Sequence, residues 1–360
     1  MKYLLYCLFI ILHIFVLNSQ VWANQTPELI KYEHYGEKSY EEQHKGYNLL
    51  VMGNALYDKI LKCDSDNDTN LILKEVRVLE GGYKEISKDQ FEQFSNKCPV
   101  IKVSSGGSVA NSLKTFVKLG GKGAIIGNIE KDKAGEAFIK DLKDIGANTF
   151  LNVKNLGKGT GEVCVFISQD GERTMLGYLG SALDFEINEI NIDIFTEYKV
   201  FLTEAYLLDS NKGSIALKYA VKEAKNHSMY SALTLSSDDI VKKHKKNILE
   251  ILQQIDIVFG NFAEFKELLN VDNIKQIIDK SQKELNISVV TLGSKGAIII
   301  TPNEVITIEP EKIIKKDKIN TLGAGDAFAG AFLYGYINGY DLKSCGKLAS
   351  KVAAQTIQTS

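Results

Sequence analysis

Asn320-Thr321-Leu322-Gly323-Ala324-Gly325-Asp326-Ala327-Phe328 is the stretch of this sequence that best indicates its fold and its chemistry. Two glycines flank an alanine, an acid follows, and later apolar residues recur at helical spacing. The pattern predicts a tight turn that leads into a helix N-terminus. Backbone N–H groups of Gly323, Ala324 and Gly325 can converge on an anion there, because the helix dipole adds partial positive charge.

Asp326 is the only charged side chain in this turn. A carboxylate beside a bound anion is unfavourable unless it receives a proton during a reaction. The stretch therefore predicts phosphoryl transfer, with Asp326 as the base.

Working outward from this turn, short apolar runs alternate with amphipathic ones from about residue 47 onward. Hairpins are predicted at 162–178 and 297–308, on either side of Asp-Gly and Pro-Asn turns. The alternation predicts an α/β fold with a mainly parallel sheet covered by helices. We expect strands at 47–52, 124–126, 199–203, 229–235, 256–259 and 287–292, and helices at 113–119, 134–145, 212–225, 239–254, 262–269 and 272–285.

Composition excludes some classes of partner. The chain has 360 residues, is 44% hydrophobic and carries a formal charge of −2, so it can bury a large core and nothing draws it to nucleic acid. Its cysteines lack the paired spacing of zinc or redox motifs. We interpret them as structural thiols, with disulfides among the last four as the alternative. They are Cys7, Cys63, Cys98, Cys164 and Cys345.

The N-terminal segment differs from the rest. Lys2 precedes an apolar run from Tyr3 to Leu17, and Val21-Trp22-Ala23 offers small residues at a cleavage site, which predicts a signal peptide over 1–23. Residues 24–46 are polar and lack periodicity, and are expected to be a disordered linker or a second targeting segment. The folded domain is expected at 47–360, with no stable membrane span once the signal peptide is removed.

Ligands bind at the carboxyl ends of strands in open α/β sheets. Two motifs follow predicted strands in the first half of the chain. In Gly53-Asn54-Ala55-Leu56-Tyr57-Asp58, Asn54 and the Asp58 carboxylate can receive the hydroxyls of a sugar. Gly106 and Gly107, with Asn111 in the next helix, allow a polyol to approach the backbone. The alternative for Asp58 is an acid on a surface turn.

Two more strand ends lie in the second half. Asn261 and Glu264 would place an amide and a carboxylate on one face of a helix start, suited to water-bound Mg²⁺. The simpler interpretation of Asn261 is a helix N-cap. Thr291, Gly293 and Gly296 form a glycine turn able to hold the phosphates or ribose of a nucleotide.

These residues carry a resemblance. Asn320 to Phe328 resembles the Asp-Thr-x-Gly-Ala-Gly-Asp motif of the PfkB (ribokinase-like) family of carbohydrate and nucleoside kinases. Asn261-x-x-Glu264 is similar to that family's magnesium motif, and Ser105 to Asn111 looks like its N-terminal glycine signature. The resemblance covers about residues 47–359. It implies a ribokinase-like three-layer α/β/α fold with a small β-rich lid, whose elements are expected at about 59–103 and 161–180.

The resemblance also implies roles. Asp326 would remove the proton of the acceptor hydroxyl, and Gly323, Ala324 and Gly325 would form the anion hole. ATP and Mg²⁺ would be the cofactors, with Mg²⁺ held through water by Asn261 and Glu264. The remaining residues divide between the ATP side (Asn261, Thr291, Gly293 and Gly296) and the acceptor side (Asn54, Asp58, Gly106, Gly107 and Asn111).

The long segment between the first strand and the double glycine most resembles the adenosine-kinase-like branch. The acceptor is therefore expected to be a nucleoside, adenosine above all, phosphorylated at its 5′ hydroxyl, as in purine salvage. A sugar kinase of ribokinase or fructokinase type is the alternative. A third is a catalytically silent relative that binds a nucleoside or sugar, because Asn320 replaces the usual Asp at the head of the motif.

A signal peptide on an ATP-consuming kinase implies delivery through the secretory pathway to an organelle that contains ATP. A misassigned start codon would instead make the protein cytoplasmic. A monomer and a homodimer are both compatible with the sequence.

Overall fold

The computed structural model describes residues 48–63, 65–80, 82–168, 173–313 and 323–359, all within one compact unit that spans 46–360. Several predicted features lie outside the described residues: the signal peptide (1–23), the linker (24–46), the hairpin turn at 169–172 and the head of the motif at Asn320-Thr321-Leu322. None of the described helices combines the length and apolar character that a bilayer crossing needs.

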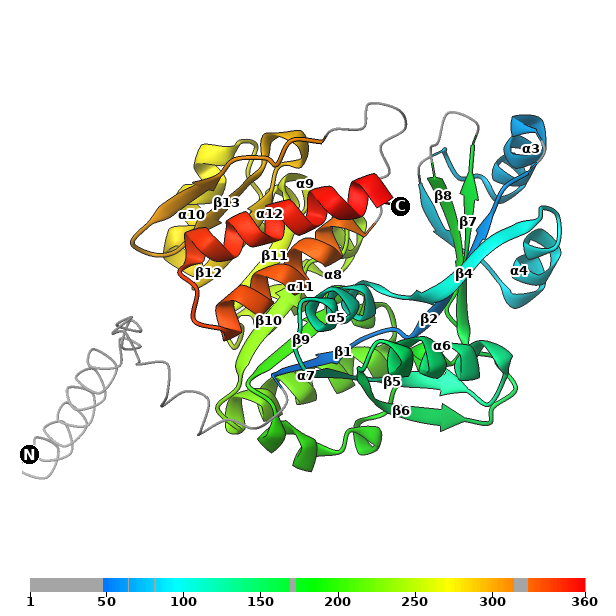
Figure 1. The fold of residues 1–360 in the computed structure, drawn as a ribbon, viewed down its shortest axis with the longest axis horizontal. Coiled ribbons are helices and arrows are strands. Elements are labelled where there is room, and N and C mark those ends of the chain that lie inside the picture. Colours follow the sequence, from blue (N-terminus) through cyan, green and yellow to red (C-terminus); the bar gives the residue numbers. More distant parts are fainter. Residues whose placement is uncertain (1–47, 64, 81, 169–172, 314–322, 360) are drawn as a thin grey trace, which may run out of the picture. The chain divides into compact units, whose positions relative to one another are not determined.

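A nine-stranded sheet forms the centre of the fold (Figure 1). Seven strands run parallel, and the hairpin β13–β14 adds two antiparallel strands at one edge. In sheet order the strands are β14 (Val305–Ile308), β13 (Ala297–Ile300), β12 (Ile287–Thr291), β11 (Ile257–Asn261), β10 (Tyr230–Thr234), β9 (Val200–Glu204), β1 (Leu49–Met52), β5 (Gly123–Glu130) and β6 (Asn148–Lys154).

Strand β1 lies between β5 and β9, so the chain builds the sheet outward from β1 in both directions. Its four residues, Leu-Leu-Val-Met, are all buried, because helices cover both faces of the sheet. Leu49 and Val51 point into one core, and Leu50 and Met52 point into the other. The reversal of strand order beside β1 is where a ligand is expected to bind in such a sheet.

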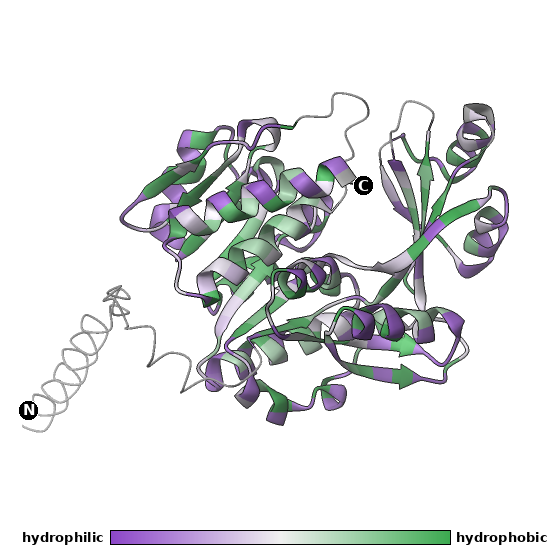
Figure 2. Cartoon of the chain, in the orientation of Figure 1, coloured by the Kyte–Doolittle hydropathy of each residue, from purple (hydrophilic) through white to green (hydrophobic). Residues whose placement is uncertain are grey.

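Helices cover the two faces, which gives the three-layer arrangement (Figure 1). Figure 2 shows hydrophobic residues concentrated on the strands and alternating with hydrophilic ones along outer helices such as α12. One face packs against α5 (Ser108–Lys118), α6 (Lys133–Asp144), α11 (Ala324–Ile337) and α12 (Leu342–Thr359), and the other against α7 (Asn211–Asn226), α8 (Asp238–Leu252), α9 (Phe262–Leu269) and α10 (Ile274–Glu284). Short 3₁₀ turns complete the chain: η1 (Gly180–Asp184), η2 (Ile187–Glu189), η3 (Ile192–Glu197), η4 (Ala205–Asp209) and η5 (Gly293–Lys295).

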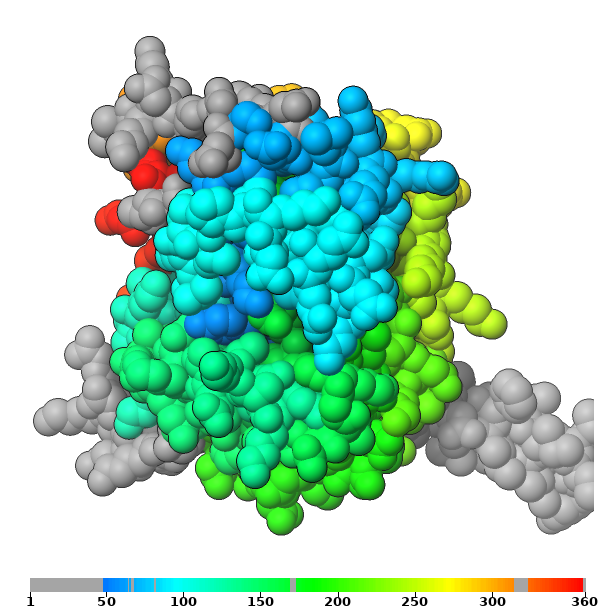
Figure 3. Space-filling view, turned by 90° about the vertical axis from the view of Figure 1, so that its right-hand side faces the viewer, coloured from blue at the N-terminus to red at the C-terminus, as the bar shows by residue number. Residues whose placement is uncertain are grey.

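A second, five-stranded sheet, here called the lid sheet, has its own small apolar core. Its blue and cyan segments form much of the face turned to the viewer in Figure 3. In order it contains β3 (Tyr83–Glu85), β8 (Arg173–Tyr178), β7 (Gly161–Ile167), β2 (Leu56–Leu61) and β4 (Val100–Gly106), and it is accompanied by α3 (Asp66–Val76) and α4 (Lys88–Ser95).

The fold class predicted from the sequence is confirmed, and most strands and helices lie within a few residues of their predicted bounds. The lid elements β2, α3, β3, α4 and β4 were expected only as a region, without individual bounds, and β6 was not predicted. Strands β2 and β4 are largely half-exposed or exposed and lack a continuous apolar run. Helix α3 begins in an acidic stretch that masks its apolar face, and Ser65 caps it by accepting a hydrogen bond from the Asp68 N–H.

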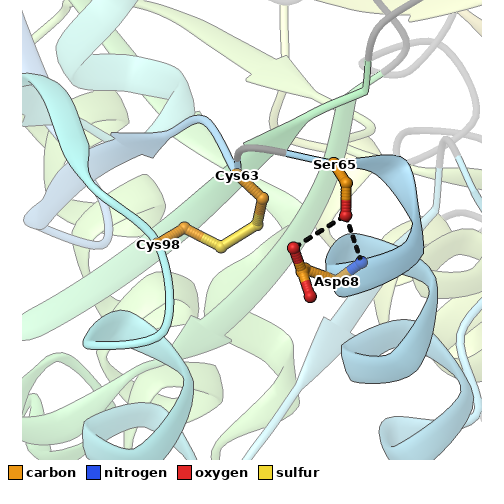
Figure 4. Close-up of a disulfide and its surroundings, with 4 residues drawn as sticks. All are labelled: Cys63, Ser65, Asp68 and Cys98. Atoms are coloured by element: carbon orange, nitrogen blue, oxygen red, sulfur yellow. Dashed lines mark hydrogen bonds between the residues drawn. A yellow bond between two sulfur atoms is a disulfide. The ribbon is translucent and has the colours of Figure 1, made fainter.

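The interpretation of Cys63 and Cys98 as separate structural thiols was wrong, since the two form a disulfide (Figure 4). The antiparallel pairing of β2 with β4 brings the end of one strand beside the start of the other, which places the two sulfurs within bonding distance. Cys164 and Cys345 are buried free thiols, as predicted, and burial raises the pKa of each to about 12.

Candidate active site

Glu204 ends β9 and joins the two segments that meet beside β1. Its Oε1 accepts a hydrogen bond from the Asn54 N–H at 2.7 Å, and its Oε2 accepts one from the Val109 N–H at 3.2 Å. Glu204 is 1% exposed, and burial raises its pKa to about 7 against the opposing effect of these two hydrogen bonds. The buried carboxylate thus fixes the turn after β1 against the first turn of α5.

Asp58 lies in β2 and faces the double glycine at the end of β4. A Cβ added at Gly106 would lie 2.3 Å from both Asp58 carboxylate oxygens, and one at Gly107 would lie 2.2 Å from the Asn54 carbonyl oxygen. Gly107 also has a φ of +94°, which favours glycine. The two glycines therefore allow the Asn54–Asp58 segment to pack closely on them. Asp58 is not an exposed turn acid: it is half-buried, and desolvation raises its pKa to about 7.

Asp326 is held by two side chains of α5. Ser108 Oγ donates to Asp326 Oδ1 at 2.6 Å, and Asn111 Nδ2 donates to Asp326 Oδ2 at 3.1 Å. Ser108 and Asn111 are three positions apart, so they lie on the same face of the helix. Burial raises the pKa of Asp326, while these hydrogen bonds and the charge of Lys114 lower it. The carboxylate is thus held in one orientation, on a residue that is partly buried.

Close packing of α5 on α11 makes this arrangement possible. Gly330 in α11 lies against the α5 backbone, where an added Cβ would be 2.2 Å from the Ser112 carbonyl oxygen. Phe116 and Tyr334 contact edge to face, with ring centroids 5.7 Å apart. The two helices therefore hold Asp326 at a fixed distance from Ser108 and Asn111.

The N-terminus of α11 has the properties of an anion site. Gly323 is its N-cap, with a φ of +73° and no side chain that caps the helix. A Cβ at Gly325 would meet no other atom within 4 Å, so packing in the described part of the protein does not explain a glycine there. Glycine is unfavourable in a helix, and space beside the first N–H groups of a helix, which have no partner within the helix, suits a ligand.

Asn261 and Glu264 form a reciprocal capping box at the start of α9. Asn261 Oδ1 accepts from the Glu264 N–H at 2.9 Å, while the Glu264 carboxylate accepts from the Asn261 N–H at 2.9 Å and from Asn261 Nδ2 at 2.7 Å. The N-cap interpretation of Asn261 is therefore confirmed. The pKa of Glu264 is raised to about 7, mainly by burial and also by the charges of Asp238 and Asp326, against the lowering effect of the Asn261 N–H hydrogen bond.

The chemistry of this pair fits Mg²⁺ bound through water. A buried carboxylate whose acidic neighbours disfavour its charge is a place where a divalent cation is stabilising. Direct coordination fits less well, because both Glu264 oxygens already accept hydrogen bonds. Among the described residues, no three acidic, His or Cys side chains gather as a metal cluster.

The predicted glycine turn follows β12, next to Asn261. Thr291 pairs with Asn261 in the register of β11 and β12, so the two residues stand side by side at the carboxyl ends of adjacent strands. Gly293 has a φ of +60°, and a Cβ added there would meet no atom of the described residues within 4 Å. Gly296 has a structural reason to be glycine, because an added Cβ would lie 2.0 Å from the Ile308 carbonyl oxygen.

The predicted site residues thus form two groups. Asn54, Asp58, Gly106, Gly107 and Asn111 gather around Asp326 through α5 and β2, whereas Asn261, Glu264, Thr291, Gly293 and Gly296 lie at the ends of β11 and β12. The negative charge of Asp326 raises the pKa of both Glu204 and Glu264, so Asp326 lies within electrostatic reach of both groups.

Sequence reasoning did not assign roles to three residues of the site: Ser108, Lys114 and Glu204. Ser108 and Lys114 share a helix face with Asn111, a spacing visible in the sequence. Glu204 directly follows the predicted strand at 199–203, where the rule on strand ends would have found it.

Comparison with known proteins agrees with this geometry. The model of the pfkB family of carbohydrate kinases matches residues 82–360. A nucleoside kinase from Methanocaldococcus jannaschii is 27% identical, and the match covers 73% of this chain and 82% of the kinase. Adenosine kinase 2 from Arabidopsis thaliana is 25% identical, and the match covers 87% of this chain and 94% of that kinase.

Solved structures are similar too. The adenosine kinase from Sinorhizobium meliloti has a TM-score of 0.80 at 28% identity and covers 87% of this chain and 94% of its own. A probable sugar kinase from Rhizobium etli has a TM-score of 0.80 at 29% identity, and the match covers 87% of this chain and 93% of that protein. The matched motifs, the fold and these relatives together establish that the chain belongs to the pfkB family of carbohydrate kinases.

Proposed function

We propose that this protein transfers the γ-phosphoryl group of ATP to the 5′ hydroxyl of a nucleoside, with adenosine the favoured acceptor. The observation that carries the proposal is the position of Asp326, in the first turn of α11. Its carboxylate is oriented by Ser108 and Asn111 beside an uncapped helix N-terminus with open space at Gly325.

In the proposed reaction, the acceptor hydroxyl gives its proton to Asp326 as its oxygen bonds to the γ-phosphorus. The bond between that phosphorus and the bridging oxygen breaks, and ADP leaves. The N–H groups of Gly323, Ala324 and Gly325 stabilise the negative charge on the transferred group. Desolvation raises the pKa of Asp326, which makes it a better proton acceptor than an exposed aspartate.

Two further sets of residues bind the reactants. On the acceptor side, Asp58 accepts hydrogen bonds from ribose hydroxyls, and Asn54 and Asn111 line the same space. On the ATP side, Thr291 and Gly293 approach the nucleotide. Asn261 and Glu264 would hold Mg²⁺ through water, and the cation would neutralise charge on the phosphates.

The names of the similar proteins support a nucleoside acceptor but leave a sugar as the second candidate. Adenosine kinases and a nucleoside kinase match most of the chain, and so does a probable sugar kinase at 29% identity. The lid sheet carries two helices, α3 and α4, and has an apolar core of its own, and such a cover is compatible with a nucleoside acceptor.

The test is ADP release with Mg-ATP and adenosine, ribose or fructose as acceptor, with the product identified by mass spectrometry. We expect adenosine to be converted to its 5′-monophosphate with the highest kcat/KM. Faster turnover of ribose or fructose would favour the sugar kinase. Binding of adenosine by calorimetry without turnover of any acceptor would favour the catalytically silent relative.

Asp326→Asn is the matched variant, because it preserves shape and removes the base. We expect kcat to fall at least ~10³-fold, since Asp326 both accepts the proton and orients the hydroxyl. The unfolding midpoint should show whether the variant is folded. A folded Asp326→Asn protein that retains more than a tenth of the activity would contradict the assignment of the base.

We also propose that the chain enters the secretory pathway and is cleaved after Ala23. The Cys63–Cys98 disulfide supports this, because such bonds persist in oxidising compartments. Delivery to an organelle that contains ATP would then supply the co-substrate. Mass analysis of the mature protein should find Asn24 or a later residue at the N-terminus, and finding Met1 would refute cleavage.

A further inference from the structure

Lys114 is a cation inside the proposed acceptor site that the proposed reaction does not use. It lies on α5, three residues after Asn111 on the same face of the helix. Its side chain is half-buried, and its Nζ donates a hydrogen bond to the Ser105 carbonyl oxygen at the end of β4. Ser105 N–H in turn donates to Asp141 Oδ2 of α6 at 2.7 Å. Lys114 thus links the main helices to the base of the lid sheet.

Carboxylates from three other elements act on this ammonium group. Asp58 of β2, Asp326 of α11 and Asp141 of α6 each favour its charged form, while Lys118, one turn further along α5, opposes it. Burial is the largest influence and lowers the pKa of Lys114. The contacts place the ammonium near both site carboxylates: Ser105, whose carbonyl oxygen accepts from Lys114, precedes Gly106, which packs against the Asp58 carboxylate. Asn111, one turn before Lys114, donates to Asp326.

The effect on the carboxylates is reciprocal. Lys114 is the strongest charge that lowers the pKa of Asp58, against burial and the negative charge of Asp326. It also lowers the pKa of Asp326, which is further influenced by Ser108 and Asn111.

Beyond Lys114, other titratable groups face this cluster. Asp326 acts on Glu204 and Glu264, and Asp141 acts on Tyr57. Glu204, Glu264, Asp141 and Tyr57 are all acids, so none of them can supply a positive charge in place of Lys114.

We propose that Lys114 is a positioning residue whose charge holds Asp58 and Asp326 together as carboxylates and fixes β4 against α5, so that the acceptor binds a preformed, ionised site. The inference rests on the proposed function, because it assigns Asp58 to the acceptor and Asp326 to the base. Its main effect is on acceptor binding, since Asp58 is the charge that acts most strongly on Lys114.

The test uses three variants of the full chain. Lys114→Met removes the charge and keeps most of the length, Lys114→Arg restores a charge, and Lys118→Met removes an exposed cation from the same helix as the control. Each is assayed for kcat and KM for adenosine from pH 5.5 to 9, together with adenosine binding by calorimetry over the same range.

For Lys114→Met we expect the acid limb of kcat/KM to move up by about one pH unit, because Asp58 then binds a proton more readily. Because the pKa of Asp58 is about 7 in the wild type, this corresponds at pH 7 to roughly fivefold weaker adenosine binding, with a larger change in KM than in kcat. Lys114→Arg should restore the position of the limb. Lys118→Met should leave the acid limb at its wild-type position, because loss of Lys118 only favours the charged form of Lys114. The inference would be overturned if the pH profile of kcat/KM for Lys114→Met coincided with that of the wild type. Equal losses of kcat/KM in Lys114→Met and Lys114→Arg, without a shift of the acid limb, would also overturn it.

If Lys114→Met fails to fold, Lys114→Arg still tests the role of charge. A guanidinium stays protonated, so the acid limb of kcat/KM should keep its wild-type position in this variant. An acid limb displaced to higher pH in a folded Lys114→Arg protein would contradict the inference. If the wild type itself turns over no acceptor, the proposed function fails separately, and the pH dependence of adenosine binding then decides the role of Lys114.

Discussion

Replacing Gly325 with alanine should separate folding from phosphoryl transfer. The added Cβ would meet no atom of the described residues within 4 Å, and Gly325 has ordinary helical backbone in the first turn of α11. Alanine is the better helix former, so the free energy of unfolding should stay the same or rise by about 0.5 kcal/mol. A methyl group in the proposed anion hole, by contrast, should keep the phosphoryl group away from the N–H groups and lower kcat about 10²-fold.

Gly330→Ala in the same helix is the matched comparison. Here the added Cβ would lie 2.2 Å from the Ser112 carbonyl oxygen and 2.9 Å from its carbon, and both are backbone atoms of α5. Helix α5 or α11 must shift, so we expect a loss of about 1–3 kcal/mol in stability. The two substitutions are chemically identical and should have opposite effects on stability.

The assays are urea unfolding followed by circular dichroism, and steady-state ADP release with Mg-ATP and adenosine. Gly325→Ala should unfold at the wild-type urea concentration or above it and be a poor catalyst. If it keeps activity within twofold of the wild type, no anion binds closely at the N-terminus of α11. If it unfolds well below the wild type, the open space beside Gly325 is not present in solution.

Two other predictions concern stability. The double variant Cys63→Ala/Cys98→Ala should be less stable by about 3–4 kcal/mol, because the disulfide closes a loop with a sequence separation of 35. Cys164→Ala, at a buried free thiol, is the control. Equal urea midpoints of the wild type with and without reductant would contradict the disulfide. Burial raises the pKa of Glu204 to about 7, from a value of 4.5 in the unfolded chain. The folded state therefore binds more protons than the unfolded state between these pH values. The contribution of Glu204 to the free energy of unfolding should fall as pH rises from about 4.5 to 7. Glu204→Gln should flatten that part of the stability profile, and a profile with the wild-type slope would show that Glu204 titrates normally.

Local patterns explain why much of the fold could be predicted. The buried strand β1 is a continuous apolar run, and the helices repeat apolar residues at helical spacing, so each element is visible within a few residues of sequence. The capping box of Asn261 and Glu264 is equally local, because its partners are three residues apart.

Elements that depend on distant partners were harder to predict. Strands β2 and β4 have half-exposed and exposed residues and are stabilised mainly by pairing with each other and with β7, a contact between segments about 40 to 100 residues apart. The Cys63–Cys98 disulfide depends on the same pairing. Cysteine spacing alone carries no information about it, since the bond requires only that the two strands lie side by side.

The sequence by itself determined the α/β fold, the turn at Gly323–Asp326 and most of the residues around it, because helix and strand periodicity, turn glycines and strand-end polar residues are short-range features. Only the tertiary structure revealed how Asp326 is held. Ser108 lies 218 residues before Asp326, and Glu204 lies 150 residues after Asn54, yet each pair is joined by a hydrogen bond. Burial and charge in the site depend on which distant segments meet. Lys114 therefore acquires its three carboxylate neighbours only when β2, α5, α6 and α11 pack together.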